Sequence, residues 1–328
     1  EHPMIVVTGG AGFIGSATVW RLNTRGMNDI LIVDDLGTDE KWKNLVALSY
    51  RDYLNKHDFL KMVKDDTLPY DVTAIIHLGA NSSTTERDAE HLMSNNYHYT
   101  KTLAQFCLSK NIRFIYASSA ATYGDGSLGF NDDDAACLKL RPLNMYGYSK
   151  NLFDSWAYQT GAINHIAGIK YFNVYGPNEA HKGDMRSVVH KAFEQIRDTG
   201  EVKLFTSLHP DYKDGEQKRD FVYVKDAVDM TLFFLDKPNA NGLFNVGTGK
   251  ARTWIDLVTA IFKALDQQPS ISFVDLPQHL AAKYQYFTEA NLDKIKKAGY
   301  SDSIGTLEHG VTDYVRNYLV KGCYLGDE

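Results

Sequence analysis

The chain has 328 residues, of which 44% are hydrophobic and 23% are charged, and its formal net charge is −6. This length and composition supply enough apolar surface for one large globular domain or two unequal lobes. The acidic balance lacks the basic footprint of proteins that bind nucleic acid or anionic membranes, so we expect neither as a partner and predict a small-molecule substrate.

The cysteines and the hydrophobic runs indicate a cytoplasmic protein. Cys107, Cys137 and Cys323 are far apart and odd in number, which fits a reducing compartment and offers neither a disulfide framework nor a metal site. No apolar run approaches the roughly 18 residues of a membrane span, and no charged-then-apolar leader precedes the first apolar run.

Short apolar runs alternate with amphipathic stretches in the first half, which predicts parallel strands joined by helices in a Rossmann-like, doubly wound α/β fold. We expect strands at residues 4–8, 30–34, 74–78, 114–118 and 165–172, with a further candidate at 45–49. We expect helices at residues 12–26, 57–64, 95–109 and 145–161.

The alternation ends after Tyr175-Gly176-Pro177. Beyond it we predict helices at 185–199 and from 225, short strands at 202–205, 221–222 and 244–246, and a helix opened by Thr253 with Asp256 as a capping box. Residues 4–172 should form a dinucleotide-binding domain. Residues 173–328 should form a smaller α/β substrate lobe, with a chain that can cross back, and the polar stretch 209–218 should be a surface loop, as a lid or otherwise.

A glycine-rich loop, Thr8-Gly9-Gly10-Ala11-Gly12-Phe13-Ile14-Gly15, follows the first strand and opens a helix. Such a loop lets backbone N–H groups approach a pyrophosphate, although a plain strand-to-helix turn is the alternative. Asp34 ends the next strand about 20 residues later, where a carboxylate binds a ribose hydroxyl, and this favours the cofactor site. Asp34 alone favours NAD, whereas Lys41 or Lys43 could accommodate the 2′-phosphate of NADP, so the choice stays open.

Tyr146 and Lys150 are four residues apart and share a helix face. The ammonium of Lys150 should lower the pKa of the Tyr146 phenol from its usual value near 10, which suits proton exchange with a sugar hydroxyl. Ser119, at the end of the preceding strand, should hydrogen-bond the reacting oxygen, while Ser118 should be structural. Tyr97 and Lys101 have the same spacing but no strand-end hydroxyl nearby, so we interpret them as a structural pair.

Three further side chains remain ambiguous from chemistry alone. Lys182 is either a second proton-transfer group or a solvated loop lysine. Arg219 either binds a phosphate or forms a surface ion pair with Asp220 or Asp226. Tyr284 and Phe287 either stack on a base or pack, and packing is favoured.

The order of the glycine loop, Ser119, Tyr146 and Lys150 resembles the extended short-chain dehydrogenase/reductase family, whose members modify nucleotide sugars. Residues 81–86, 116–124, 171–177, 181–185 and 219–224 more narrowly resemble the heptose 6-epimerases of that family. The resemblance implies that the chain inverts C6 of ADP-heptose with bound NADP, NAD being possible, and forms a homo-oligomer, often a pentamer. It also implies a bacterial cytoplasmic role in making the lipopolysaccharide core.

The same resemblance assigns roles to individual residues. It implies that Tyr146 and Lys182 are catalytic and that Ser119 and Lys150 assist. Implied cofactor contacts are Gly9, Gly12, Phe13, Ile14, Gly15, Asp34, Asp35, Lys41, Lys56, Leu78, Gly79, Ala80, Asn81, Ser82, Asn95, Tyr146, Lys150 and Val174. Implied substrate contacts are Ser119, Asn173, Asp184, Lys191, Phe205, Arg219 and Tyr284. Asn81, Asp184 and Lys191 depart from the Cys, Ser and His more usual there, and the Asp184 carboxylate would repel a pyrophosphate.

Three alternatives make different demands on the residues. A UDP-hexose 4-epimerase needs Ser119, Tyr146 and Lys150 but gives Lys182 no role. A non-catalytic, nucleotide-sensing Rossmann protein has no need to keep serine, tyrosine and lysine together. A 4,6-dehydratase needs an acid after the serines, where this chain has Ala120 and Ala121.

Overall fold

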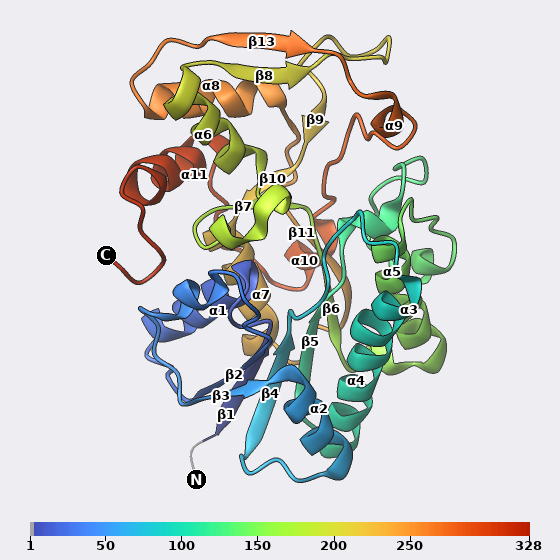
Figure 1. Ribbon diagram of the computed structural model, residues 1–328. Coiled ribbons are helices and arrows are strands. Elements are labelled where there is room, and N and C mark those ends of the chain that lie inside the picture. Colours follow the sequence, from blue (N-terminus) through green and yellow to red (C-terminus); the bar gives the residue numbers. More distant parts are fainter. Residues whose placement is uncertain (1–2) are drawn as a thin grey trace.

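A computed structural model describes residues 3–328 and contains a seven-stranded, wholly parallel sheet in the order β11-β6-β5-β4-β1-β2-β3 (Figure 1). Its strands are β1 (Met4–Thr8), β2 (Ile30–Asp34), β3 (Asp52–Asn55), β4 (Val72–His77), β5 (Arg113–Ala117), β6 (Ala167–Tyr171) and β11 (Gly242–Val246). Every residue of β1, β2, β6 and β11 is buried. Such continuous burial is typical of a parallel sheet that is covered on both faces.

Helices cover the two faces of this sheet. They are α1 (Phe13–Thr24) and α7 (Val224–Asp236) on one face, and α2 (Lys56–Asp65), α4 (Tyr99–Lys110) and α5 (Met145–Thr160) on the other. Alternate residues of β1 divide between the two cores: Ile5 and Val7 pack with residues of α1 and α7, whereas Met4 and Val6 pack with residues of α2, α4 and α5. The prediction of a doubly wound Rossmann-like fold is confirmed.

A second group of elements lies above the carboxyl ends of the strands in Figure 1. Its helices are α6 (Val188–Thr199), α8 (Trp254–Ala264) and α11 (Leu307–Tyr314), with short α3 (Ala89–Leu92), α9 (Gln278–Ala281) and α10 (Asp293–Lys297) elsewhere. Its strand pairs are β8 (Val202–Phe205) with β13 (Ile271–Val274), β7 (Asn173–Tyr175) with β10 (Phe221–Tyr223), and β9 (Lys218–Arg219) with β12 (Arg252–Thr253). β11 and α7 return the chain to the large sheet. No helix between residues 3 and 328 is long and apolar enough to cross a membrane.

Two expectations differ from the structure. The strand candidate at 45–49 is wrong: residues Lys41–Leu45 form a 3₁₀ turn, and the strand is β3 instead. β3 is an edge strand that is mostly half-buried and begins with an exposed Asp52, so it lacks an apolar signature. The helix expected at 95–109 begins earlier, because α3 continues through a π turn, η2 (Met93–His98), into α4. The Thr253–Asp256 capping box is confirmed.

Candidate active site

The loop between β1 and α1 is packed backbone against backbone. Gly9 has a φ of 64°, and a Cβ there would lie 2.7 Å from the Gly79 backbone nitrogen. A Cβ on Gly15 would lie 1.9 Å from the Gly9 carbonyl oxygen, which no side chain could tolerate. No side chain caps α1 at Gly12. The first N–H groups of this helix are therefore available to an anionic ligand, such as a phosphate.

Asp34 lies beside this loop and forms an ion pair with a lysine. Its side chain is 8% exposed, and its Oδ2 accepts a hydrogen bond from the Ala11 backbone nitrogen at 2.8 Å. Its Oδ1 accepts from the Lys41 Nζ at 2.9 Å. Lys43 instead pairs with Glu40 at 3.0 Å. Lys41, and not Lys43, is thus the cation at the end of β2.

One cavity at the carboxyl ends of the strands collects many of the predicted cofactor contacts. It is lined by Thr8, Gly9, Val33, Asp34, Asp35, Lys41, Lys56, His77, Gly79, Ala80, Asn95 and Tyr99. Across it, the Lys56 Nζ donates to the Asn95 Oδ1 at 2.9 Å. The other predicted contacts do not line this cavity: Gly12, Phe13, Ile14 and Gly15 lie at the start of α1, Leu78, Asn81 and Ser82 follow β4, Tyr146 and Lys150 lie on α5, and Val174 lies in β7.

Sequence reasoning missed the polar residues beneath this cavity. The hydroxyl of Thr8 lies 2.6 Å from the His77 Nδ1, and the His77 Nε2 lies 2.9 Å from the Thr100 Oγ1. Burial, and then the charge of Lys150, lowers the pKa of His77 to about 3, so the imidazole is neutral. Thr8 and His77 are paired in register at the ends of β1 and β4. That shared strand-end position is the signal that would have identified them.

Asn96 is a second missed residue, and it connects the two halves of the site. Its Oδ1 accepts from the Asn81 backbone nitrogen at 3.0 Å, and its Nδ2 donates to the Ser149 Oγ at 3.1 Å. The loop after β4 is thereby joined to α5, the helix that carries Tyr146. The amide side chain is 1% exposed and is placed by the π turn.

Ser119 and Tyr146 meet at the end of β5. The Ser119 hydroxyl accepts from the Ala121 backbone nitrogen at 3.0 Å and lies close enough to the Tyr146 phenol to influence its pKa. The helix α5 can approach the turn after Ser119 closely because Gly147 has no side chain. A Cβ on Gly147 would lie 2.9 Å from the Ala121 carbonyl oxygen. Burial raises the pKa of Tyr146, and the nearby Ser119 side chain partly opposes that rise. The phenol therefore holds its proton at neutral pH.

Lys150 lies on the same helix but has a different partner. It is 5% exposed, and its Nζ donates to the Ala117 carbonyl oxygen at 2.8 Å. Burial lowers the pKa of Lys150 to about 8, although Asp154 opposes this change. The expectation that Lys150 lowers the pKa of Tyr146 is wrong for this structure, because the ammonium is directed at the end of β5 and burial dominates at the phenol.

The buried carboxylate of Asp154 accepts hydrogen bonds from side chains at the end of β5. Asp154 is fully buried and accepts from the Tyr116 hydroxyl at 2.8 Å and from the Ser118 Oγ at 2.5 Å. Burial raises the pKa of Asp154, while Lys170, itself 1% exposed, is the largest influence that opposes this rise. The structural role predicted for Ser118 is confirmed.

Lys182 lies against the start of the cofactor loop. It belongs to the 3₁₀ turn η6 (Ala180–Met185), and its Nζ lies 5.2 Å from the centre of the Phe13 ring. Asn44 holds the two segments together, since its Nδ2 donates to the Ala11 and Asn178 carbonyl oxygens at 2.9 and 3.2 Å. Burial lowers the pKa of Lys182, and the charge of Glu179 opposes that shift. No hydrogen bond links Lys182 to Tyr146 in the described part of the chain.

Arg219 is a buried cation between two aromatic rings. It is 7% exposed, and its guanidinium carbon lies 5.5 Å from the Trp254 ring centre and 5.3 Å from that of Tyr284. The surface ion pair considered for Arg219 is wrong, because Asp220 is fully buried and accepts instead from Thr248 and backbone nitrogens. The Arg219 Nη1 donates to the Lys218 carbonyl oxygen at 2.9 Å, and the planar fork of a guanidinium suits a phosphate.

The other predicted substrate residues are not joined to this cluster. Asn173, Asp184 and Phe205 are exposed, and Lys191 is half-buried on α6. Phe287 is exposed, and one side of its ring contacts Phe130, with the ring centres 6.2 Å apart. Tyr97 and Lys101 contact each other, with the ammonium 5.7 Å from the ring centre and 5.5 Å from that of Trp156, as expected of a structural pair.

Comparison with known proteins agrees with this arrangement. The model of the NAD dependent epimerase/dehydratase family matches residues 5–247. The chain belongs to this family. It is 60% identical to the ADP-L-glycero-D-manno-heptose-6-epimerase of Nitratidesulfovibrio vulgaris over 96% of this chain and 98% of that protein. The protein of the same name from Fusobacterium nucleatum is 49% identical over 97% of this chain and 98% of its own length. The crystal structure of the Helicobacter pylori ADP-L-glycero-D-manno-heptose-6-epimerase has a TM-score of 0.80 at 27% identity, covering 97% and 96% of the two chains.

Membership of the epimerase/dehydratase family implies a nicotinamide cofactor, and the residues present fit one. The uncapped N-terminus of α1 offers N–H groups to a pyrophosphate, and the close packing at Gly9 and Gly15 brings the backbone to that position. Asp34 and Lys41 lie at the end of β2, where the ribose of a dinucleotide is bound in such folds. Ser119, Tyr146 and Lys150 occupy the end of β5 in the same sheet edge.

Proposed function

We propose that this epimerase/dehydratase converts ADP-D-glycero-D-manno-heptose to ADP-L-glycero-D-manno-heptose by inverting C6. The proposal is supported by the names of the relatives that match nearly the whole chain. The observation that carries it is that Lys182 lies over Phe13 at the start of α1, while Tyr146 lies beside Ser119 at the end of β5. We assign proton transfer to both side chains. We assign the nucleotide sugar mainly to residues 173–328.

Inversion through a transient C6 ketone requires an acid or base on each face of the sugar carbon. A nicotinamide cofactor, held by the N-terminus of α1 and by Asp34 and Lys41, would supply reversible hydride transfer at C6. Tyr146 holds its proton at neutral pH because burial raises its pKa, and Ser119 orients the phenol. Lys182 gives up a proton more readily than an exposed lysine because burial lowers its pKa. One of the two takes the C6 hydroxyl proton, and the other donates a proton to the re-reduced oxygen.

The residues distinguish this reaction from its rivals. A UDP-hexose 4-epimerase uses the Ser119–Tyr146 pair but leaves the amine of Lys182 over Phe13 without a purpose. A dehydratase requires an acidic residue directly after the serines in sequence, and the turn after Ser119 contains Ala120 and Ala121 there. A nucleotide sensor has no need for a serine, a tyrosine and a lysine brought together at the end of β5.

We further infer that the bound cofactor is NADP. Lys41 neutralises Asp34 across 2.9 Å, and its ammonium is placed to bind a 2′-phosphate that the carboxylate alone would repel. Mass spectrometry of the nucleotide released on denaturation tests this inference. A homo-oligomer and a role in the lipopolysaccharide core stay predictions, the first of which light scattering of the purified protein can check.

The test of the reaction uses ADP-D-glycero-D-manno-heptose as substrate, with the product followed by NMR. The natural chain should interconvert the two C6 epimers. Lys182→Met should lose epimerisation by about 10²–10⁴-fold, the usual contribution of a general acid or base, while its cofactor occupancy stays unchanged. Normal turnover in that variant would contradict the assignment of Lys182, and turnover only at C4 of UDP-hexoses would replace the proposed reaction.

A further inference from the structure

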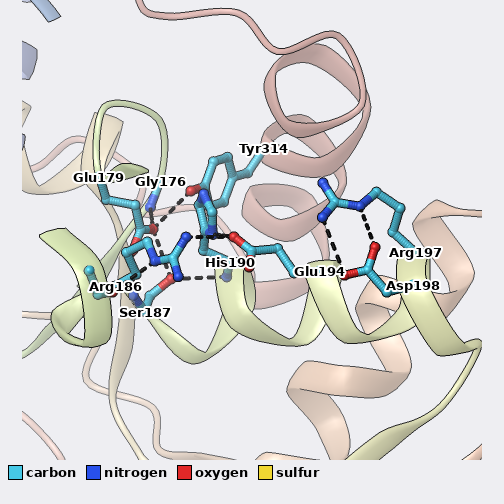
Figure 2. A network of polar contacts seen from close by, with 10 residues as sticks. Gly176, Glu179, Arg186, Ser187, His190, Glu194, Arg197, Asp198 and Tyr314 are labelled. Atoms are coloured by element: carbon cyan, nitrogen blue, oxygen red, sulfur yellow. Dashed lines mark hydrogen bonds and ion pairs between the residues drawn. The ribbon is translucent and has the colours of Figure 1, made fainter. Parts of the chain in front are cut away.

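Glu179 is a buried carboxylate at the base of the segment that carries Lys182. It is 1% exposed, and its Oε2 accepts from the Gly176 backbone nitrogen at 3.1 Å, the Ser187 Oγ at 2.8 Å and the Tyr314 hydroxyl at 3.0 Å. Its Oε1 accepts from the Ser187 backbone nitrogen. Figure 2 shows these donors converging on the one side chain.

The donors to Glu179 come from both ends of the Lys182 segment and from a distant helix. Gly176 precedes the segment and Ser187 follows it, while Tyr314 belongs to α11. The Lys182 backbone nitrogen also donates to the Glu179 carbonyl oxygen at 3.0 Å. Glu179 therefore closes residues 176–187 into a loop and fastens that loop to α11.

The loop that Glu179 closes contains three residues with a positive φ, Gly176 at 146°, Asn178 at 77° and Gly183 at 57°. Glycine adopts a positive φ freely, so Asn178 is the one whose conformation needs contacts that enforce it. The Asn178 Nδ2 donates to the Ser16 Oγ at 2.9 Å, and its Oδ1 accepts from the Leu325 backbone nitrogen at 3.0 Å. The hydrogen bonds from Gly176 and Ser187 to Glu179 fix the chain on both sides of Asn178.

The geometry requires a carboxylate rather than an amide at this position. Both oxygens of Glu179 act as acceptors for N–H or O–H donors. A glutamine would turn its NH₂ group towards at least one of those donors and leave it unsatisfied. The nearby Arg186 is engaged elsewhere, because its guanidinium contacts Glu194 at 2.6 Å (Figure 2). His190 also contacts Glu194, at 2.9 Å, and burial lowers the pKa of its imidazole.

We propose that Glu179 is a positioning residue that holds the Lys182 amine at the cofactor loop and transmits the position of α11 to it through Tyr314. The proposal rests on the function proposed for Lys182 above. Burial lowers the pKa of Lys182, and the negative charge of Glu179 opposes that shift. Loss of the charge should therefore leave the amine easier to deprotonate as well as less well placed.

The test compares Glu179→Gln with Glu194→Gln, which removes the same charge from the same region without touching Glu179. The first readout is independent of catalysis: the pH dependence of Lys182 acetylation by acetic anhydride, measured by mass spectrometry of its peptide. Glu179→Gln should move the labelling midpoint to lower pH, and Glu194→Gln should leave it in place. An unchanged midpoint in a folded Glu179→Gln protein overturns the proposal.

The second readout is the rate of epimerisation. Glu179→Gln should lower kcat by about 10–100-fold, the scale of a misplacement near 1 Å, with KM and cofactor occupancy changed little. Combined with Lys182→Met it should add no further loss, whereas an additive loss overturns the proposal. Tyr314→Phe removes one donor and should shift both readouts in the same direction by less. If Glu179→Gln fails to fold, Tyr314→Phe provides the test. An unchanged midpoint of Lys182 labelling together with an unchanged kcat in the Tyr314→Phe protein would overturn the proposal.

These readouts separate two failures. If the natural chain does not epimerise the heptose substrate, the proposed function is wrong, but the labelling of Lys182 still tests whether Glu179 positions its amine.

Discussion

Lys41 donates from its Nζ to the Asp34 Oδ1 across 2.9 Å, so the carboxylate that ends β2 is paired with a cation. If Lys41 binds a 2′-phosphate, Lys41→Ala should weaken NADP binding by roughly 10–100-fold, because a hydrogen bond to a charged group contributes about 1.5–3 kcal/mol. NAD binding should change much less. Calorimetry with the cofactor-free protein measures both constants.

Lys43→Ala is the matched control for that experiment, since Lys43 pairs with Glu40 at the surface. It should leave both affinities unchanged. Equal weakening of NAD and NADP by Lys41→Ala would mean that Lys41 only organises the loop.

The position of Ser119 beside the Tyr146 phenol predicts that substitutions of the two residues lower kcat to different extents. Tyr146→Phe removes the proton itself and should lower kcat by about 10²–10⁴-fold. Ser119→Ala leaves the phenol in place but removes the hydroxyl that orients it and opposes the rise of its pKa, so its loss should be smaller. Steady-state kinetics with the heptose substrate checks the order, and an inactive Ser119→Ala beside an active Tyr146→Phe would reverse the roles.

Lys150 should support catalysis but lower the free energy of unfolding at neutral pH. Burial lowers its pKa from 10.5 to about 8, so the unfolded chain keeps this proton to higher pH than the folded chain does. Stability is therefore lost as the pH falls from 10.5 to 8, by on the order of 3 kcal/mol at pH 7. Lys150→Met removes the buried ammonium and should recover this stability. The variant also loses the hydrogen bond to the Ala117 carbonyl oxygen, which offsets about 1 kcal/mol of the gain.

Urea unfolding at a series of pH values tests that prediction. Lys150→Met should be more stable than the natural chain at pH 7, its advantage should shrink between pH 8 and 10, and its kcat should fall. Lys101→Met, in the other Tyr-to-Lys pair, should retain kcat. A Lys150→Met protein that is less stable at pH 7 with no pH trend would show that burial is not the dominant effect.

Arg219 should contribute through its planar shape as well as its charge. Arg219→Lys keeps the charge but loses the fork of donors and the stacking between Trp254 and Tyr284. We expect KM for the nucleotide sugar to rise by roughly 10–100-fold, with a small change in kcat, on the scale of a lost charge-assisted hydrogen bond.

Arg252→Lys is the control for Arg219, because Arg252 is its register partner in the β9–β12 pair but contacts Glu308 and Asp256 instead. It should leave KM unchanged. A similar rise in KM for both variants would point to disruption of the strand pair.

The parts of the fold that sequence predicted are those with a strong local pattern. β1 and β2 are uninterrupted apolar runs, and the Thr253–Asp256 box marks the start of α8, so both were predictable. β3 was not, because an edge strand of polar, half-buried residues carries no such pattern. The helix before α4 was misplaced because it passes through a π turn, which periodicity does not anticipate.

Contacts between distant segments were the least predictable part of the site. The spacing of Tyr146 and Lys150 identified the helix face but not the partner of the ammonium, which depends on where β5 ends. Asn96, His77 and Glu179 act through residues far away in sequence, and no motif marks them. The burial that raises the pKa of Tyr146 is likewise a property of the packed structure.

The fate of a deuterium label at C6 tests the central claim most directly. ADP-D-glycero-D-manno-heptose labelled at C6 is incubated with the protein in ordinary water, and the product is analysed by NMR and mass spectrometry. If C6 is oxidised and reduced again within one closed site, the inverted product should keep the label at C6. Inversion with loss of the label to solvent, or a label retained without any inversion at C6, would contradict the account.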